Sequence, residues 1–353
     1  MKHKKFLSLA LVGIIGLTTL LSGCGKKTSD EPKRSTVKKH QGEEVVSVLT
    51  GEKIDDETRD TRPFAIMTEN TRDAIPQYGL NSASIIYECP VEGGITRLMA
   101  IYESIKGLNK IGNVRSCRPY YVYFASEYDA IYTHFGQSNE GKEALEKGII
   151  DEINGLSSVG NFVFFRTKDK PAPHNAYTSD EGLKKGAEKL KFSLKYDADK
   201  YKHFKFASKN KQNMLKDGKD AYKISLYFIN NHPQFIYNKD TGLYKRYQFG
   251  GEQIDKLDGK AIEVKNIILE NVTSEKYDVD KGTLNLGVKG SGTGKFITNG
   301  KVVNITWKKA GDTEPTKYFY ESGEEIKLNP GKTWISVIEE HGKDKNKITG
   351  TQE

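Results

Sequence analysis

Residues 296–303, Phe296-Ile297-Thr298-Asn299-Gly300-Lys301-Val302-Val303, carry the sequence signal that decides the fold of the second half of the chain. Two short runs rich in β-branched and aromatic residues flank the pair Asn299-Gly300. Asn and Gly accept the positive φ angles of a type I′ turn, which joins two antiparallel strands through a two-residue loop. The segment therefore predicts a β-hairpin.

Strand patterns continue on both sides of this hairpin. Apolar, aromatic and β-branched runs bounded by turn residues occur at 222–229, 234–237, 244–249, 262–269, 284–288 and 334–338. We therefore expect a mostly β C-terminal domain over residues 220–342, followed by a frayed, lysine-rich tail at 343–353.

Two glycine-rich segments in this region resemble phosphate-binding loops but lack a required glycine. The segment Gly290–Lys295 has Lys289 where the first glycine of the motif belongs, and the segment Gly331–Thr333 has Ile326 at that position. Both lie between predicted strands, so we expect turns rather than nucleotide-binding loops.

The first half of the chain alternates strand and helix patterns. Strand-like runs occur at 64–67, 85–87, 95–102, 130–134 and 162–165, and helical patterns at 119–128, 139–147 and 182–190. Thr178 and Glu181 fit a capping box before the last helix. We expect an N-terminal mixed α/β domain over residues 61–200, separated from the β domain by a lysine-rich stretch at 200–219, which gives an α+β fold class overall.

The N-terminus has the pattern of a secretory signal. Lys2, Lys4 and Lys5 precede an apolar run that is too short to span a bilayer and ends in Leu21-Ser22-Gly23-Cys24. This ending resembles a lipobox, which implies a signal peptide over residues 1–23 and acyl chains such as palmitate on a diacylglyceryl-Cys24. Two or more acyl chains hold a protein stably on a membrane. We therefore expect a lipoprotein on the outer face of the cell membrane, with Cys24 as its lipidation site.

Composition limits the remaining possibilities. Residues 25–60 are polar and charged, so we expect residues 24–60 to be the lipid anchor and a flexible tether. Loss of residues 1–23 removes three lysines and no acids, so the formal net charge falls from +8 to +5. Charges of both signs are mixed along the chain, which disfavours nucleic acid as a partner. Cys89 and Cys117 are too few for a disulfide framework, and nothing predicts a cofactor or a metal site.

Polar residues with chemical potential follow the predicted strands of the N-terminal domain. In a layered fold such positions tend to gather at one edge of a sheet, where ligands bind. Arginine is the side chain best suited to a bidentate grip on carboxylate or phosphate. The candidate ligand-binding residues are Glu88, Glu92, Arg97, Arg115, Arg118, His134, Arg166, His174 and Asn175.

The same segments resemble the YerB-like lipoproteins, a Gram-positive family of unassigned biochemical function. The resemblance covers nearly all of the expected ordered chain. It includes Arg62-Pro63, Glu92-Gly93, Val114-Arg115-Ser116, Pro173-His174-Asn175, Asp240–Arg246, Gly290-Ser291-Gly292 and Pro330–Ile335. It implies a lipid-anchored surface protein with an N-terminal and a C-terminal domain, and it supplies no catalytic assignment. Cys89 and Cys117 stand where small or apolar residues are expected.

Two functions of different class fit these residues. The first is a binding or accessory protein whose arginine-lined pocket holds an anionic cell-wall ligand, or which serves a surface protein partner. The alternative is a cell-surface hydrolase that uses Glu92, His134 or Ser138. Ser138 also fits a helix N-cap, and the arginines could instead pair with Glu88, Glu92 and Glu127 as a structural network. The sequence leaves open the ligand, the oligomeric state and whether Cys89 and Cys117 are bonded.

Overall fold

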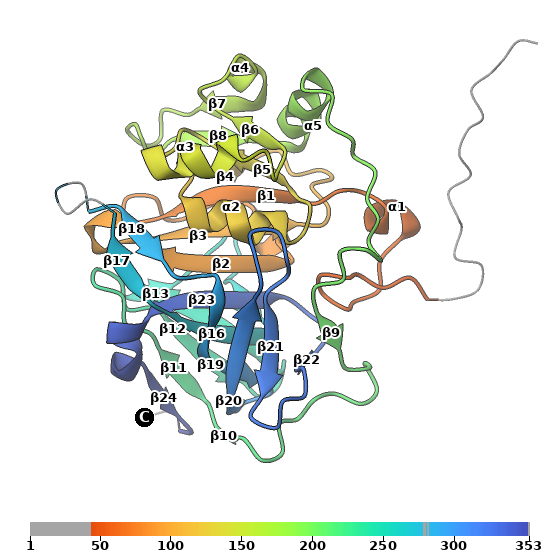
Figure 1. Cartoon of the computed structure of the whole chain (residues 1–353), viewed down its shortest axis with the longest axis vertical. Helices are drawn as coiled ribbons and strands as arrows, with labels where there is room; N and C mark the ends of the chain where they lie inside the picture. The colour runs from red at the N-terminus through yellow and green to blue at the C-terminus, as the bar shows by residue number, and fades with distance from the viewer. Residues whose placement is uncertain (1–43, 278–279, 281, 352–353) are drawn as a thin grey trace, which may run out of the picture. The chain divides into compact units, whose positions relative to one another are not determined.

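The computed structural model describes residues 44–277, 280 and 282–351 of the 353-residue chain. The described residues, from 44 onward, belong to one compact unit. The signal peptide, Cys24 and the first part of the predicted tether lie outside the described residues. The predicted class is confirmed: the N-terminal region mixes helices and strands, and the C-terminal region is mostly β (Figure 1).

An eleven-stranded sheet in the described part of the chain unites the two regions (Figure 1). Its order is β10-β20-β19-β16-β23-β2-β3-β1-β5-β6, and β21 pairs with β20. The strands are β1 (Phe64–Asn70), β2 (Ile85–Pro90), β3 (Thr96–Tyr102), β5 (Ile131–His134), β6 (Glu152–Asn154), β10 (Lys219–Asp220), β16 (Asn266–Val272), β19 (Gly290–Thr298), β20 (Lys301–Lys309), β21 (Lys317–Tyr320) and β23 (Thr333–Glu339).

The two regions meet where β2 pairs in parallel with β23. Ile85 is opposite Thr333 in this ladder, and Glu88 is opposite Ser336. Hydrophobic residues from both regions also mix on each face of the sheet: one cluster contains Tyr87 and Ile335, and the other contains Ile86 and Trp334. The N-terminal and C-terminal regions therefore share both their sheet and their core.

The other strands form four smaller sheets. The largest has the order β14 (Gly251–Glu252), β13 (Leu243–Gln248), β12 (Gln234–Asn238), β11 (Lys223–Ser225) and β24 (Lys347–Thr349), with β15 (Glu263–Val264) beside β13. A three-stranded sheet has the order β4 (Ile111–Gly112), β8 (Ala176–Thr178) and β7 (Phe164–Arg166). The pairs are β17 (Ser274–Lys276) with β18 (Leu284–Leu286), and β9 (Lys205–Phe206) with β22 (Lys327–Leu328).

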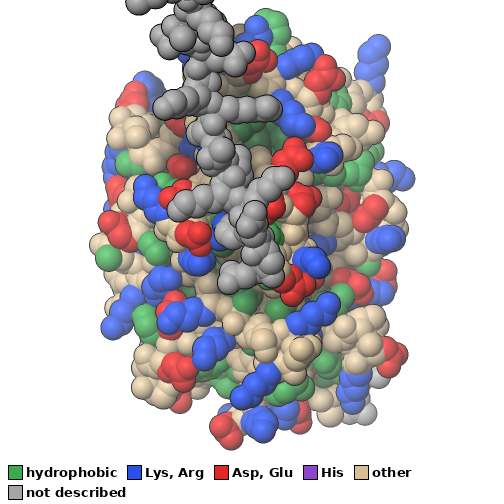
Figure 2. Space-filling model, turned by 90° about the vertical axis from the view of Figure 1, so that its right-hand side faces the viewer, with side chains coloured by type: hydrophobic (Ala, Val, Ile, Leu, Met, Phe, Trp, Pro, Cys, Tyr) green, Lys and Arg blue, Asp and Glu red, His purple; other side chains and the backbone are tan. Residues whose placement is uncertain are grey.

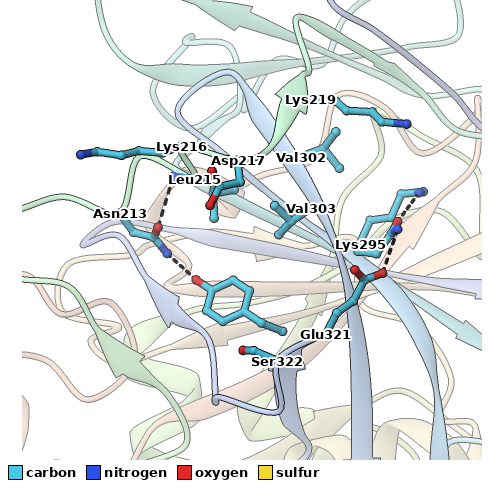
Figure 3. A pocket seen from close by; sticks show the side chains of 12 residues that line it. Asn213, Leu215, Lys216, Asp217, Lys219, Lys295, Val302, Val303, Glu321 and Ser322 are labelled. Carbon is cyan, nitrogen blue, oxygen red and sulfur yellow. Dashed lines mark hydrogen bonds between the residues drawn. The ribbon is translucent and has the colours of Figure 1, made fainter.

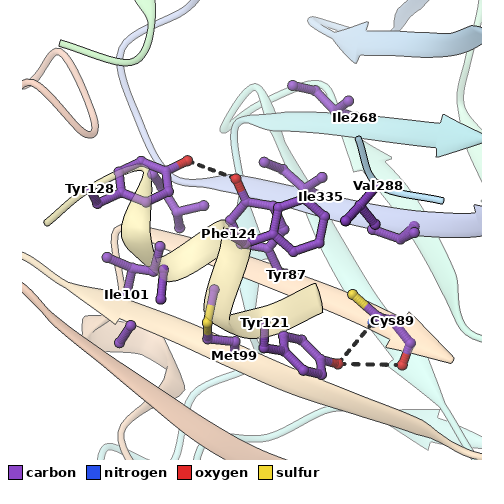
Figure 4. Packing of buried hydrophobic residues seen from close by; sticks show 14 of the residues in the cluster. Tyr87, Cys89, Met99, Ile101, Tyr121, Phe124, Tyr128, Ile268, Val288 and Ile335 are labelled. Carbon is purple, nitrogen blue, oxygen red and sulfur yellow. Dashed lines mark hydrogen bonds between the residues drawn. The ribbon is translucent and has the colours of Figure 1, made fainter. Parts of the chain in front are cut away.

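The helices are short. They are α1 (Asp56–Arg59), α2 (Pro119–Ser126), α3 (Asn139–Glu146), α4 (Gly160–Val163), α5 (Asp180–Lys189) and the 3₁₀ turns η1 (Leu80–Ser82), η2 (Glu92–Gly94) and η3 (Glu340–Lys345). Helix α2 covers one face of the large sheet, where the Phe124 ring stacks on Tyr87 at a centroid distance of 4.5 Å (Figure 4). Such aromatic pairs add about 0.5–1.5 kcal/mol to the gain from burial.

The predicted hairpin at 296–303 is confirmed. Thr298 pairs with Lys301 across the turn. Asn299 and Gly300 have φ angles of 49° and 74°, as a type I′ turn requires.

The prediction of a turn at Gly290–Lys295 was wrong, because this segment belongs to β19. Gly292 and Gly294 are needed there for close packing rather than for turning. A Cβ atom on Gly292 would lie 2.5 Å from Trp307 Nε1, and one on Gly294 would lie 2.3 Å from the Leu269 carbonyl oxygen. Glycine lacks the side chain that gives a strand its alternating pattern, so the sequence of this segment did not indicate a strand.

Three boundaries also differ from the prediction. The cap of α5 is Ser179, which accepts a hydrogen bond from the Gly182 N–H, whereas Thr178 lies in β8. Residues 162–163 of the strand predicted at 162–165 belong to the helix α4, and residues 164–165 lie in β7. The tail is not frayed throughout, because β24 pairs with β11.

Both segments predicted to be connectors contribute to the fold. The tether does not reach residue 60, since Val48 and Leu49 are buried in the core. The stretch predicted as a linker at 200–219 supplies β9 and the first residue of β10.

On the face shown in Figure 2, acidic and basic side chains are interspersed rather than separated by sign.

Candidate functional site

Charged residues gather at one end of the large sheet, on the face that α2 covers. Glu69 of β1 is opposite Arg97 of β3, and Arg97 is opposite Cys89 of β2. Neighbours two positions away on these strands, Met67 and Tyr87, belong to the hydrophobic cluster under α2. Because side chains alternate between the faces of a sheet, Glu69, Arg97 and Cys89 share that face.

The loop at 113–118 brings two further arginines to the same end. Arg97 Nη1 donates to the Ser116 carbonyl at 2.8 Å, and Arg118 Nη1 donates to the adjacent Cys117 carbonyl at 2.7 Å. Arg118 also forms a two-point ion pair with Glu92. Arg97 and Arg118 are both almost fully buried. Arg97 and Arg118 thus bond to the same loop, and Arg118 is already neutralised by Glu92. The arginine-lined pocket predicted from the sequence stays a prediction.

Arg115 and His174 contact the carboxylate of Glu69. His174 Nδ1 lies 2.9 Å from Glu69 Oε1, and Arg115 Nε lies 3.7 Å from the same oxygen. Burial lowers the pKa of Arg115; the charge of Glu69 opposes that shift, while the charges of Arg97 and Arg166 add to it. Arg115 therefore lies within the electrostatic range of two other arginines.

Arg166 completes this group from the end of β7. Its Nη1 donates to Asn175 Oδ1 at 2.7 Å, and its guanidinium lies over the Phe135 ring at 4.8 Å. Arg166 is exposed, and Asn175 directly follows His174 in the chain. We call Glu69, Arg97, Arg115, Arg166 and His174 the Glu69 cluster.

Several polar atoms of this region are buried without a hydrogen-bond partner. They are Glu69 Oε2, Arg115 Nε and Asn113 Oδ1. Such atoms are few in folded proteins, and each calls for an explanation such as a ligand or an ordered water. Glu69 was missed by the sequence prediction because only the apolar run at 64–67 was recognised as a strand, and Glu69 lies two residues beyond it. The available signal was that Glu69 carries a carboxylate near the end of a strand, where ligand-binding residues were expected.

Glu88 does not belong to this group, because it faces the other side of the sheet. It is fully buried and accepts two hydrogen bonds from Arg246, at 2.9 and 3.0 Å. Asn70, Thr96 and Trp334 also donate to it. Glu88 is therefore a structural residue that joins the large sheet to β13.

The catalytic candidates do not form a nucleophilic site. Ser138 is the N-cap of α3 and accepts a hydrogen bond from the Gly141 N–H at 3.1 Å. His134 is fully buried, with one ring nitrogen 2.8 Å from the Gly136 carbonyl and the other in contact with Glu152. Within the described residues, no hydrogen bond joins Ser138 to a histidine. Glu92 is held by Arg118.

The two cysteines are free and buried. Burial raises the pKa of Cys117 to about 12 and raises that of Cys89 well above its usual value. Both therefore remain protonated thiols at neutral pH and behave as small apolar side chains.

Two cavities of the described chain have other linings. A groove of about 580 Å³ lies beside β20 and includes Leu215, Lys295, Val303 and Tyr320 (Figure 3). A second, of about 600 Å³, borders Glu92 and Ile229. Neither is lined by Arg97, Arg115 or Arg118. The Glu69 cluster is instead a near-surface group beneath the exposed turn at 171–173.

Within the part of the chain that the structure describes, no helix is long and apolar enough to cross a bilayer. The same residues contain no group of three or more His, Cys, Asp or Glu side chains arranged to hold a metal ion.

Comparison with known proteins places the chain in a family. Models of a protein family of unknown function, DUF3048, match it twice: the N-terminal domain over residues 49–193 and the C-terminal domain over residues 224–335. YerB of Bacillus subtilis (strain 168), a protein named as a lipoprotein, is 31% identical over 295 residues, which cover 82% of this chain and 85% of YerB. The crystal structure of Bacillus subtilis YerB matches with a TM-score of 0.74 and 28% identity, covering 86% of this chain and 99% of that one.

Proposed function

Since the chain belongs to the DUF3048 family, which has no assigned activity, we propose from its geometry that it is a lipid-anchored binding protein for an anionic cell-wall component. The anchor is the diacylglyceryl group on Cys24, which holds the protein on the outer face of the cell membrane. The likeness to a lipoprotein supports this location. The ligand site is the Glu69 cluster.

One observation carries the binding site. Arg115 and His174 contact the carboxylate of Glu69, and Arg97 lies opposite Glu69 in the sheet. Burial lowers the pKa of Arg115, and the charges of Arg97 and Arg166 lower it further, so both lie within electrostatic range of Arg115. Three cations beside one contacting anion leave positive charge that an anionic ligand would neutralise. Guanidinium groups bind carboxylate and phosphate in two-point geometry, and such bonds gain strength from partial burial.

The hydrolase alternative has weaker support. Ser138, His134 and Glu92 each make local contacts that explain their presence, as an N-cap, a buried hydrogen-bonded ring and an ion-pair partner. A nucleophile needs a base within hydrogen-bond reach, and neither Ser138 nor His134 has the other as a partner.

Binding of a short poly(glycerol phosphate) tests this function. The fragment 44–353 is suitable for this test. The match to the crystallised YerB chain covers 99% of that chain but only 86% of this one, so a related protein folds without a counterpart to the rest. Isothermal titration calorimetry should show binding that weakens tenfold or more in Arg115→Gln, a loss of about 1.4 kcal/mol. Binding should also weaken with added salt, because salt screens charges near the surface.

Arg59→Gln is the matched control. Arg59 lies just before β1, at the end opposite Glu69, and pairs with Asp199. Between Arg59 and Glu69 lie five residues of β1, Phe64–Thr68, which span roughly 17 Å. Equal affinity in wild type and Arg115→Gln would contradict the proposal, as would an equal loss in Arg59→Gln.

A further inference from the structure

Two buried acceptor atoms lie beside the arginines without a donor. Glu69 Oε2 and Asn113 Oδ1 are inaccessible to solvent and make no hydrogen bond. The Glu69 residue is 2% exposed and the Asn113 residue is 0% exposed. Leaving such an acceptor unpaired costs roughly 1–3 kcal/mol, and more when the group is charged.

The same histidine holds both of these side chains. The Glu69 carboxylate contacts the His174 ring, and the Asn113 amide donates to the His174 carbonyl. The backbone N–H of Glu69 also donates to the Asn113 carbonyl at 2.9 Å. Glu69 and Asn113 are therefore neighbours in a fixed arrangement.

The nearby cations make no hydrogen bond to Glu69 Oε2. Arg115 Nη1 donates to the Pro173 carbonyl at 3.3 Å, and Arg115 Nε is itself without an acceptor. Lys170 Nζ is bound to the carbonyls of Ala74, Ile75 and Pro76. Neither side chain supplies the donor that Glu69 Oε2 needs.

A metal ion fits these atoms poorly. Glu69 and His174 provide two ligands of the kind that zinc uses, and they already contact each other at 2.9 Å. Structural and catalytic zinc sites take three or four protein ligands. An N–H donor suits a carboxylate oxygen and an amide oxygen better.

We infer that the ligand of this site carries an ammonium group beside its anionic group. The ammonium donates to Glu69 Oε2 and Asn113 Oδ1, and the anionic group binds Arg115 and Arg166. The ligand class is therefore an amino acid or an amino acid-like end group, in which a primary amine and a carboxylate share one carbon. This inference rests on the proposed anion site and names its ligand class.

Alanine and propionate are the probes, because they differ in the amino group. Their affinities for the fragment 44–353 are measured by NMR titration. Alanine should bind at least tenfold more tightly than propionate. Glu69→Gln should abolish this preference because it removes the charge and retains the shape, whereas Arg115→Gln should weaken both ligands together. Asn113→Ala should reduce the preference for alanine over propionate and leave the binding of the ligand carboxylate unchanged.

Glu143→Gln is the matched control, since Glu143 is exposed on α3. It should keep the full preference for alanine, and thermal unfolding should confirm that each variant is folded. Equal binding of alanine and propionate would overturn this inference and leave the anion site intact, as would binding of neither by a protein that still binds poly(glycerol phosphate). Equal binding of poly(glycerol phosphate), alanine and propionate by wild type and Arg115→Gln would overturn both proposals. An unchanged preference in Glu69→Gln would show that water, not ligand, serves the buried oxygens.

Discussion

Glu88 of β2 and Arg246 of β13 form an ion pair in which both side chains are fully buried, with Arg246 Nη2 2.9 Å from Glu88 Oε1. The Arg246 guanidinium lies 4.1 Å from the centre of the Trp334 ring, and its Nε donates to Gln253 at 2.6 Å. The pair connects the large sheet to the six-stranded sheet. Its location, between elements distant in the chain, makes the fold depend on both partners.

Arg246→Met should lower the free energy of unfolding by roughly 3–5 kcal/mol, because it leaves the buried charge of Glu88 without a partner. Urea denaturation of the fragment 44–353 measures this loss. Lys142→Met is the control: Lys142 pairs with Glu146 on the exposed surface of α3, where an ion pair contributes about 0.3–0.5 kcal/mol. Similar losses of unfolding free energy in the two variants would show that the buried pair stabilises the fold no more than the exposed pair does.

Glu270 makes stability depend on pH. Burial raises its pKa to about 8, although the hydrogen bond from the Tyr318 hydroxyl opposes the rise. A carboxyl group with a raised folded pKa binds its proton more tightly in the folded state. Its contribution to stability is therefore complete below about pH 4.5 and is lost as the pH rises to about 8.

Glu270→Gln keeps a neutral side chain at every pH, so it should gain stability relative to wild type between pH 5 and pH 8. The upper limit of this gain is roughly 4 kcal/mol. Urea denaturation at both pH values measures it. Part of the pH dependence of the unfolding free energy should remain in the variant, because burial also raises the pKa of Glu103 to about 7. Identical pH dependence in the two proteins would contradict the assignment to Glu270.

Gly292→Ala should cost about 1–3 kcal/mol of unfolding free energy, since the new Cβ would displace Trp307 from its hydrogen bond to the Asn271 carbonyl. Thermal and urea unfolding measure the loss, and tryptophan fluorescence should report the shift of Trp307. Gly251→Ala in β14 is the matched control, because nothing lies within 4 Å of its Cβ position. A stable Gly292→Ala protein would refute the packing role of this strand.

Cys24→Ala should move the protein from the membrane fraction to the soluble or secreted fraction, because the thiol that receives the diacylglyceryl group is absent. Cell fractionation measures this change, with Ser29→Ala as a control that retains the cysteine. Mass spectrometry of the mature wild-type protein should find lipid on Cys24. An unmodified cysteine there would refute the anchor.

The sequence predicted features that depend on local chemistry. The Asn299-Gly300 turn and the Ser138 cap follow from the backbone preferences of those residues, and both are found in the structure. Arg97 and Arg118 bond to adjacent carbonyls of the loop at 113–118, but the arginine-lined pocket expected at this sheet edge stays a prediction.

Features that depend on distant pairing were not predictable. Nothing local to Glu88 indicates that Arg246 neutralises it, so Glu88 looked like a ligand-binding residue. Glu69 looked like an ordinary strand residue until its contact with His174 placed it at the centre of a charged cluster. Burial at Val48 and Leu49 likewise depends on the core that the rest of the chain provides.

The pairing of β2 with β23 joins strands that are far apart in the chain. Synthesis begins at the N-terminus, so β2 is present long before β23, whose Thr333 must pair with Ile85. Until then β2 is an unprotected edge strand, and exposed edges of this kind attract pairing with other chains. Contacts that span so much sequence also form slowly. Early folding of this protein therefore carries a risk of association through the open edge of β2, and pairing with β23 removes that risk.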